Sequence, residues 1–158
     1  MKDVICPVNI CYTSEAAREI YESAGGFAPA TEGSAGIDLR MCGESDVFIA
    51  PGERVLVPSG ISVQPKRAGV ASFVYSRSGL GAREGITVAQ GVGLIDPDYT
   101  GEIRVMLLNT SSVGRVVRRG ERMAQLVFQP FFRADCTVVP ALDSTARGSG
   151  GFGHTGAV

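Results

Sequence analysis

Residues 47–63, VFIAPGERVLVPSGISV, set the pattern that decides the fold class. Val55 and Val57 alternate with polar or outward-facing positions, and so do Ile61 and Val63, while Pro51-Gly52 and Ser59-Gly60 interrupt the runs. Alternation with a period of two between turn residues is typical of β-strands, because a helix places its apolar residues three and four positions apart. This stretch therefore predicts short strands joined by tight turns.

The same pattern continues along the chain, with turn signals at roughly the eight-to-twelve-residue interval expected of a β-sandwich or barrel. A length of 158 residues fits one ordinary domain. We expect an all-β fold. Besides the strands in 47–63, further strands are predicted at 70–75, 85–88, 103–108, 113–117, 123–128 and 136–139, with a first strand near 4–12.

One segment departs from the β pattern. Residues 14–24, SEAAREIYESA, place Ala16, Ala17, Ile20, Tyr21 and Ala24 on one helical face. A serine at position 14 is a suitable N-cap, and two glycines at 25 and 26 are a suitable stop. We expect a short helical insertion after the first strand.

Composition excludes several classes of function. Lys and Arg number 15 against 16 Asp and Glu, so no positive field favours nucleic acid as a partner. No apolar stretch approaches the ~20 residues that span a bilayer, which argues against a membrane protein. The single histidine, His154, excludes sites that need two imidazoles. We expect a soluble intracellular protein, with cytoplasm and nucleus not distinguished.

The four cysteines, Cys6, Cys11, Cys42 and Cys136, show no C-x-x-C pair and no spacing suited to zinc or redox chemistry. The sequence predicts that they are buried, reduced and small apolar residues of the core.

Asp96 ends an apolar run within residues 91–102, GVGLIDPDYTGE. A carboxylate at the end of a buried strand would be partly desolvated, which raises its basicity and suits it to take a proton from water. Tyr99, three residues later, offers a ring that can pack on a sugar. The alternative is an ordinary turn, since Asp-Pro is common turn chemistry.

Arg77, Ser78 and Gly79 follow a predicted strand and offer a guanidinium, a hydroxyl and an unobstructed backbone N–H. These groups suit a phosphate, although an ordinary turn with an exposed arginine is the alternative. Asp38 and Gln125 lie among apolar neighbours on predicted strands, where an unpaired polar group is costly. Each therefore needs a partner, and Arg122 is the expected partner for a buried acid.

Residues 147–156, RGSGGFGHTG, are rich in glycine, and such a terminus is most often simply disordered. Interleaved with the glycines, however, are Arg147, Phe152 and Thr155. A mobile segment that closes over a ligand would need such parts, with the ring stacked on a planar group and the guanidinium on an anion.

Taken together and in order, five stretches resemble the trimeric deoxyuridine triphosphatase (dUTPase) family. They are SAGIDL (34–39), SRSGL (76–80), GLIDPDYTGEI (93–103), GERMAQL (120–126) and RGSGGFGHTG (147–156). The resemblance implies a jelly-roll-like distorted β-barrel at 1–146 and a flexible C-terminal arm at 147–158 that closes over the active site. It further implies a homotrimer with active sites between subunits, and hydrolysis of dUTP to dUMP and pyrophosphate with Mg²⁺. Such an activity lowers dUTP and supplies dUMP for thymidylate synthesis.

The resemblance also assigns roles to individual residues. Asp96 matches the acid that activates the attacking water, and Tyr99 matches the aromatic residue against the deoxyribose. The phosphate-binding turn corresponds to Arg77, Ser78 and Gly79. Asp38 and Gln125 match positions that reach magnesium only through water or phosphate, with no direct protein ligand expected.

The uracil pocket and the arm complete the implied site. Gln90 stands where many members carry an Asn that reads the uracil edge, and the backbone around Leu94, Ile95 and Arg104 completes this pocket. On the arm, Arg147 matches a contact to the terminal phosphate and Phe152 a ring over the uracil. The arm residues Gly153 and Thr155 are expected to contact the substrate as well.

The chain departs from the family pattern at Gln90, at Ser76 (usually proline), at His154 (usually serine) and in the helical insertion. Two rival functions are weighed. A dCTP deaminase shares the fold but needs a Glu ten residues after the motif acid, where this chain has Met106. A non-catalytic nucleotide- or partner-binding regulator on the same fold is expected to lose Asp96, Tyr99 or the arm, and none of these is lost.

Overall fold

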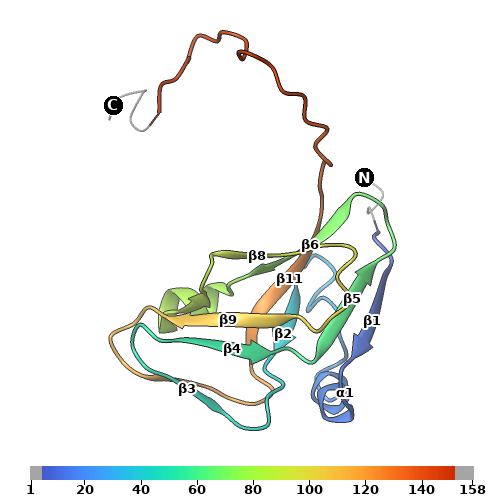
Figure 1. Cartoon of the computed structure of the whole chain (residues 1–158). Coiled ribbons are helices and arrows are strands. Elements are labelled where there is room, and N and C mark those ends of the chain that lie inside the picture. The colour runs from blue at the N-terminus through green and yellow to red at the C-terminus, as the bar shows by residue number, and fades with distance from the viewer. Residues whose placement is uncertain (1–4, 152–158) are drawn as a thin grey trace.

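A computed structural model describes residues 5–151, and within that range most of the regular secondary structure is β-strand, arranged around one core (Figure 1). In chain order the elements are β1 (Val8–Tyr12), α1 (Glu15–Glu22), β2 (Ile37–Arg40), β3 (Val47–Ile49), β4 (Arg54–Pro58), β5 (Ile61–Pro65), β6 (Val70–Tyr75), η1 (Gly79–Arg83), β7 (Ile86–Val88), β8 (Val92–Ile95), β9 (Arg104–Asn109), β10 (Arg115–Val117) and β11 (Arg122–Pro130). The all-β prediction is confirmed.

Four antiparallel sheets make up the body. The largest has the strand order β2-β11-β6-β8, and a three-stranded sheet has the order β4-β9-β7. Two-stranded sheets, β1-β5 and β10-β3, complete the body. Most neighbouring strands are distant in the sequence, as in a jelly roll, so the expected jelly-roll-like fold is confirmed.

The core lies between these sheets and is built by strand alternation. On β9, Val105 and Leu107 point inward and are buried, while Met106 and Leu108 between and after them are half-buried. Leu126 on β11 is buried by the same alternation. Each such side chain contributes about 1.5–3 kcal/mol by leaving water.

Helix α1 forms where the sequence predicts it. The Ser14 hydroxyl accepts a hydrogen bond from the Ala17 N–H at 3.1 Å, which caps the first turn. Ala17 and Tyr21 are buried, whereas Ala16 and Ala24 of the predicted apolar face are exposed. Burial raises the pKa of the Tyr21 phenol far above its ordinary value. Among residues 5–151 no helix has the length and apolar character needed to cross a bilayer.

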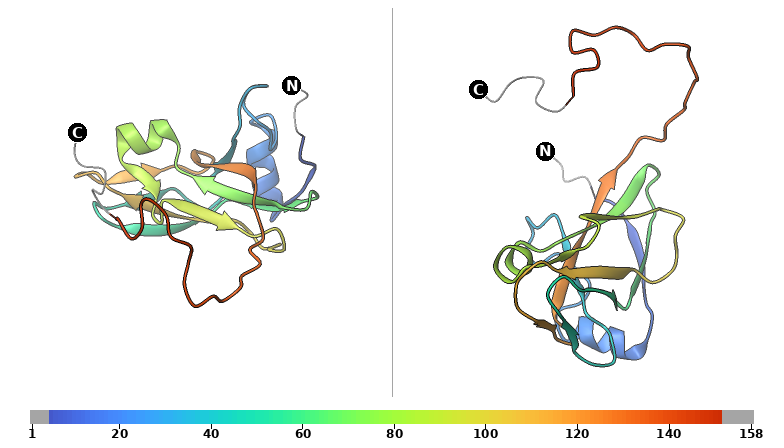
Figure 2. Two further views of the ribbon diagram at one scale, coloured as in Figure 1. Left: turned by 90° about the horizontal axis from the view of Figure 1, so that it is seen from above. Right: turned by 60° about the vertical axis from the view of Figure 1, so that its left-hand side comes forward.

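The segment after β11 leaves the body in an extended path (Figures 1 and 2). The prediction of a strand at 136–139 is wrong within the described chain, because no other strand lies beside this segment to accept its backbone hydrogen bonds. Phe132 and Val138 are fully exposed, and Leu142 nearly so. The apolar side chains of this segment are therefore largely uncovered by the rest of the described chain.

The prediction of buried cysteines is also wrong, because two of the four are exposed and the other two are only half-buried. Cys11 is exposed because it faces outward on the edge strand β1, and Cys136 is exposed on the extended segment. Cys6 and Cys42 are half-buried. Burial, assisted by the nearby Glu102 carboxylate, raises the pKa of the Cys42 thiol to about 11, which makes this thiol a poor nucleophile near neutral pH.

The turn between β4 and β5 requires glycine at position 60. Gly60 has a φ of +69°, and a Cβ there would lie 2.5 Å from the Ala17 Cβ and 2.9 Å from the Cys42 Sγ. Gly52, in the turn between β3 and β4, has a similar φ of +76° but open space around it. The two glycines thus share backbone strain and differ in packing.

We therefore expect Gly60→Ala to lower the free energy of unfolding by about 3–4 kcal/mol, from left-handed strain plus overpacking. The matched Gly52→Ala change should cost only about 1–2 kcal/mol, from strain alone. Urea denaturation at one protein concentration measures both. If both variants lose the same free energy of unfolding, α1 must shift away from the added methyl group at no cost.

Candidate functional site

Most of the residues that the sequence singles out lie in two separate hollows of the chain. One hollow is lined by residues that include Asp38, Arg77, Ser78, Gly79, Arg122 and Gln125. The other is lined by residues that include Leu94, Ile95, Asp96, Tyr99, Glu102 and Arg104. We call the first the phosphate hollow and the second the Asp96 hollow.

Asp38 organises the charges of the phosphate hollow. Arg77 Nε donates to Asp38 Oδ1 at 2.7 Å, and Arg122 Nη1 donates to Asp38 Oδ2 at 3.2 Å. Arg77 Nη1 also donates to the Arg122 carbonyl at 3.1 Å. Arg122 is thus the partner of the acid, as predicted, and Arg77 is a second one. One carboxylate orients two guanidinium groups, which leaves an excess positive charge at the hollow.

Strand register explains why these groups meet. Gln125 on β11 stands opposite Asp38 on β2 and opposite Tyr75 on β6, so side chains from three adjacent strands gather at one place. Gln125 Nε2 donates to the Ser76 carbonyl at 2.9 Å, which supplies the partner that the sequence requires. A Cβ at Gly36 would lie 2.8 Å from Gln125 Oε1, so a larger residue there would require this amide to shift.

Ser78 and Gly79 stand at the start of η1, directly after Arg77. Ser78 is exposed and Gly79 is half-buried on the wall of the phosphate hollow. The short helix η1 was not predicted from the sequence, which suggested only a turn before the strand at 85–88. It is a single π-helical turn that begins at Gly79 with Ser78 as its N-cap, and Arg77, Ser78 and Gly79 lie together on one wall of the phosphate hollow.

Asp96 lies immediately after the edge strand β8 and is exposed in the single chain. The expected partial desolvation is therefore not found within one chain, because Val92 and Leu94 before it also face outward, at 44% and 59% exposure. The prediction of a buried strand before Asp96 is also wrong for the single chain. Only Gly93 of β8 is buried.

Tyr99 is held close to Asp96 by the turn that follows β8. The Tyr99 N–H donates to the Asp96 carbonyl at 3.1 Å, and the Tyr99 hydroxyl donates to the Glu102 carbonyl at 3.0 Å. A Cβ at Gly101 would lie 2.5 Å from the Tyr99 hydroxyl, so the ring passes directly over this glycine. One face of the Tyr99 ring remains available, since the residue is 46% exposed.

Two further predicted residues occupy different positions. Arg104 is exposed on β9 and lines the Asp96 hollow. Gln90 is exposed in the turn between β7 and β8 and lines neither hollow in the single chain.

Strand pairing places the two hollows far apart. In the antiparallel pair of β6 and β8, Ser72 stands opposite Ile95 and Tyr75 opposite Val92. Arg77 follows the end of β6 and Asp96 follows the other end of the ladder. At about 3.3 Å per residue this corresponds to roughly 20 Å between them. One chain by itself does not bring Asp96 to the arginines of the phosphate hollow.

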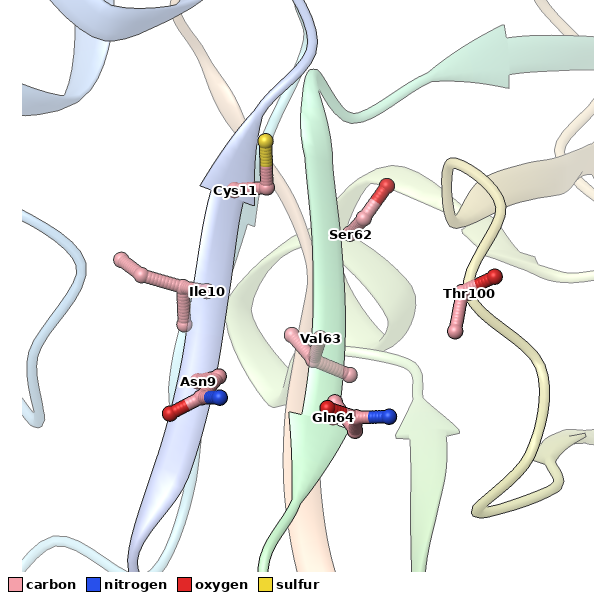
Figure 3. Close-up of a pocket in the computed structure, with 7 residues that line it drawn as sticks. All are labelled: Asn9, Ile10, Cys11, Ser62, Val63, Gln64 and Thr100. Atoms are coloured by element: carbon pink, nitrogen blue, oxygen red, sulfur yellow. The ribbon is translucent and has the colours of Figure 1, made fainter.

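A third hollow lies beside the loop of residues 96–102, between that loop and the β1–β5 pair (Figure 3). Asn9 and Cys11 of β1 stand opposite Gln64 and Ser62 of β5, and Thr100 of the loop completes the lining. None of these residues was singled out from the sequence. The loop therefore lies between two hollows.

The arm is described only in part. Arg147 is exposed, and its Nε donates to the Gly150 carbonyl at 2.9 Å in a local turn. The predicted contacts of Phe152, Gly153 and Thr155 lie outside the described residues, as does His154.

The acidic residues bear on how a magnesium ion fits. Within residues 5–151 no group of three or more His, Cys, Asp or Glu side chains is placed to hold a metal ion. Both Asp38 oxygens already accept from guanidinium groups. Each oxygen retains a further lone pair that can accept from a water molecule, so Asp38 fits a metal's water shell.

Known proteins match this chain over most of its length. The family model described as dUTPase matches residues 23–156. A deoxyuridine 5'-triphosphate nucleotidohydrolase of Desulfitobacterium hafniense is 46% identical over 80% of this chain and 84% of its own length. The protein of the same name from Actinobacillus pleuropneumoniae is 48% identical over 82% and 85%.

Solved structures agree on the fold. The dUTPase of Staphylococcus bacteriophage 80alpha, solved with dUpNHpp, superposes with a TM-score of 0.80 at 21% identity over 95% of this chain and 98% of that chain. The dUTPase of Streptococcus mutans superposes with a TM-score of 0.62 at 30% identity over 69% and 88%. The family model and these relatives match most of the chain, and the part that the family model matches contains Asp38, Arg77, Asp96 and Tyr99. The chain therefore belongs to the dUTPase family.

Proposed function

We propose that this chain hydrolyses dUTP to dUMP and pyrophosphate, as the names of its relatives state for them. The observation that carries the proposal is the Asp38 carboxylate holding Arg77 and Arg122 in one hollow, which suits a polyphosphate. Asp96 and Tyr99 in the other hollow suit water activation and a sugar.

The active form is a homotrimer in which each site joins the phosphate hollow of one copy to the Asp96 hollow of another. Support comes from the separation of roughly 20 Å between Arg77 and Asp96 within one chain, because one nucleotide could not contact both hollows of the same chain in a reactive geometry. Further support comes from exposed apolar side chains: Leu94 beside the Asp96 hollow, Leu56 on β4, and Phe132 and Val138 on the extended segment. Apolar side chains in such positions suit contacts between copies.

In the assembled site Asp96 accepts a proton from a water molecule that attacks the α-phosphorus in line with the departing pyrophosphate. Tyr99 lies against the deoxyribose, where its ring leaves no room for a 2′-hydroxyl. The backbone around Leu94, Ile95 and Arg104, together with Gln90, surrounds the uracil. Burial between copies would also give Asp96 the desolvation that it lacks alone.

Arg77, Ser78 and Gly79 bind the phosphates, and the arm completes the enclosure. Arg147 contacts the terminal phosphate and Phe152 covers the uracil, with Gly153 and Thr155 beside them. Closure of this kind excludes bulk water and strengthens every charge interaction inside the site.

A bound magnesium ion would supply positive charge to offset the charge that builds on the phosphates during hydrolysis. Asp38 and Gln125 would hold it through its water shell or through the phosphates, and not as direct ligands. Asp38 thereby serves two purposes, since it also orients Arg77 and Arg122.

The first test concerns Asp96. We expect Asp96→Asn to lower kcat by about 10³-fold, because the amide cannot accept the proton, while a non-hydrolysable dUTP analogue still binds. Pyrophosphate release and calorimetric titration measure the two effects. Asp98→Asn, in the same loop and outside the Asp96 hollow, is the matched control and should retain kcat. Unchanged turnover in Asp96→Asn would remove this residue from its role.

The second test concerns the arm. Deleting residues 147–158 should suppress dUTP hydrolysis by more than about 100-fold, because the phosphate and uracil contacts of the arm are lost. The free energy of unfolding should change little, since residues 147–151 support none of the core. Activity assays and urea denaturation measure both quantities. A truncated protein that unfolds would show instead that the arm is structural.

A further inference from the structure

Helix α1 lies outside the part of the chain that the family model matches. The match begins at residue 23, and α1 ends at Glu22. The buried face of the helix nonetheless packs on the turn between β4 and β5, and this turn is hydrogen-bonded to the loop of residues 96–102.

The first contacts join α1 to the turn between β4 and β5. The Tyr21 hydroxyl donates to the Ser59 carbonyl at 2.9 Å and accepts from the Arg40 N–H at 2.9 Å. Ala17 packs so closely on Gly60 that a Cβ at Gly60 would overlap it. The Gly60 carbonyl also accepts from the Thr13 N–H, just before the helix, at 3.0 Å. The turn is thus held from one side by the helix.

The second contacts join this turn to the loop of residues 96–102. The Gly60 N–H donates to Glu102 Oε1 at 2.8 Å, and the Ser59 N–H donates to the Ile103 carbonyl at 3.2 Å. The Ile103 N–H in turn donates to the Ile61 carbonyl at 2.9 Å. Glu102 is the one side chain in this set that reaches from the loop to the turn.

The third contact brings the chain of hydrogen bonds to the site. The Glu102 carbonyl accepts from the Tyr99 hydroxyl, so the position of Glu102 sets the position of the Tyr99 ring. The opposite end of the loop is anchored separately, because Ile95 next to Asp96 is paired with Ser72 in the sheet. A change at Glu102 should therefore move Tyr99 more than Asp96.

We propose that α1, through Tyr21, Gly60 and Glu102, positions the Tyr99 ring and so sets the preference of this chain for a deoxyribose over a ribose. Tyr21 and Glu102 are positioning residues in this account. The inference rests on the proposed function, because the preference is measured as hydrolysis of dUTP against UTP.

The experiment measures kcat and KM for dUTP and for UTP in variants of Glu102. Glu102→Ala should raise KM for dUTP by about 10-fold, with kcat changed by less than about 3-fold. The preference, which is kcat/KM for dUTP divided by kcat/KM for UTP, should fall by about 10-fold. Glu102→Gln keeps an oxygen that can accept from the Gly60 N–H, so it should restore most of both properties.

Glu53→Ala is the matched control. Glu53 Oε2 accepts from the Ala50 N–H at 2.7 Å in the turn between β3 and β4, so its loss breaks the same kind of bond away from the site. It should lower the melting temperature without changing KM or the preference. A Glu102→Ala protein that behaves like Glu53→Ala in kinetics would overturn the inference.

Tyr21→Phe gives an independent test at a residue that lines neither hollow. Removing its hydroxyl should raise KM for dUTP and lower the preference for dUTP over UTP, each by about 3-fold, because the Ser59 carbonyl loses its hydrogen-bond donor. These are the same directions as those expected for Glu102→Ala. Unchanged kinetics in folded Tyr21→Phe would overturn the role of α1, and it would do so even if Glu102→Ala failed to fold. Absence of dUTP hydrolysis in the unaltered protein would instead contradict the proposed function.

Discussion

The antiparallel pairing of β6 with β8 is the constraint on which the site depends. It sends Arg77 and Asp96 to opposite ends of one ladder, because Ser72 pairs with Ile95 while Tyr75 pairs with Val92. No side-chain rotation can close a gap of roughly 20 Å, so the register of these two strands keeps Asp96 apart from the arginines of the phosphate hollow within one chain. The exposed state of Asp96 in the single chain follows from the same edge position of β8.

The Asp38 carboxylate is the second determinant, and it acts through geometry more than through stability. Ion pairs of partly exposed side chains contribute little to folding, and Asp38 and Arg77 are each about a quarter exposed. What the carboxylate supplies is orientation: two guanidinium groups held at one place with donors to spare. A polyphosphate can then bind without first ordering two long and flexible side chains.

Local sequence was sufficient for most elements and for the composition of the site. The N-cap at Ser14, the strands between the turns, and the pairing of Asp38 with Arg122 all follow from rules that act within a few residues or on a single buried charge. The strand predicted at 136–139 and the buried Asp96 were wrong for one shared reason, because burial and strand pairing depend on long-range contacts that local sequence does not specify. The division of the site into two hollows could not be predicted either, since it depends on register between strands twenty residues apart.

The contacts of α1 show a different limit. Nothing local in SEAAREIYESA indicates that Tyr21 lies two hydrogen bonds away from the loop that carries Tyr99. The link exists because Gly60 leaves room for the helix on one side and donates its N–H to Glu102 on the other. Long-range contacts of this kind are visible only once the strands are placed.

The most direct test of the shared site is to combine two inactive variants. Asp96→Asn and Arg77→Ala proteins are each prepared, then unfolded and refolded together, and dUTP hydrolysis is compared with each variant refolded alone. If one copy supplies Arg77 and another Asp96, mixed assemblies contain some sites with both residues intact, so activity should reappear. If mixed assemblies form and activity stays absent, both residues must act from the same chain, which would contradict this account.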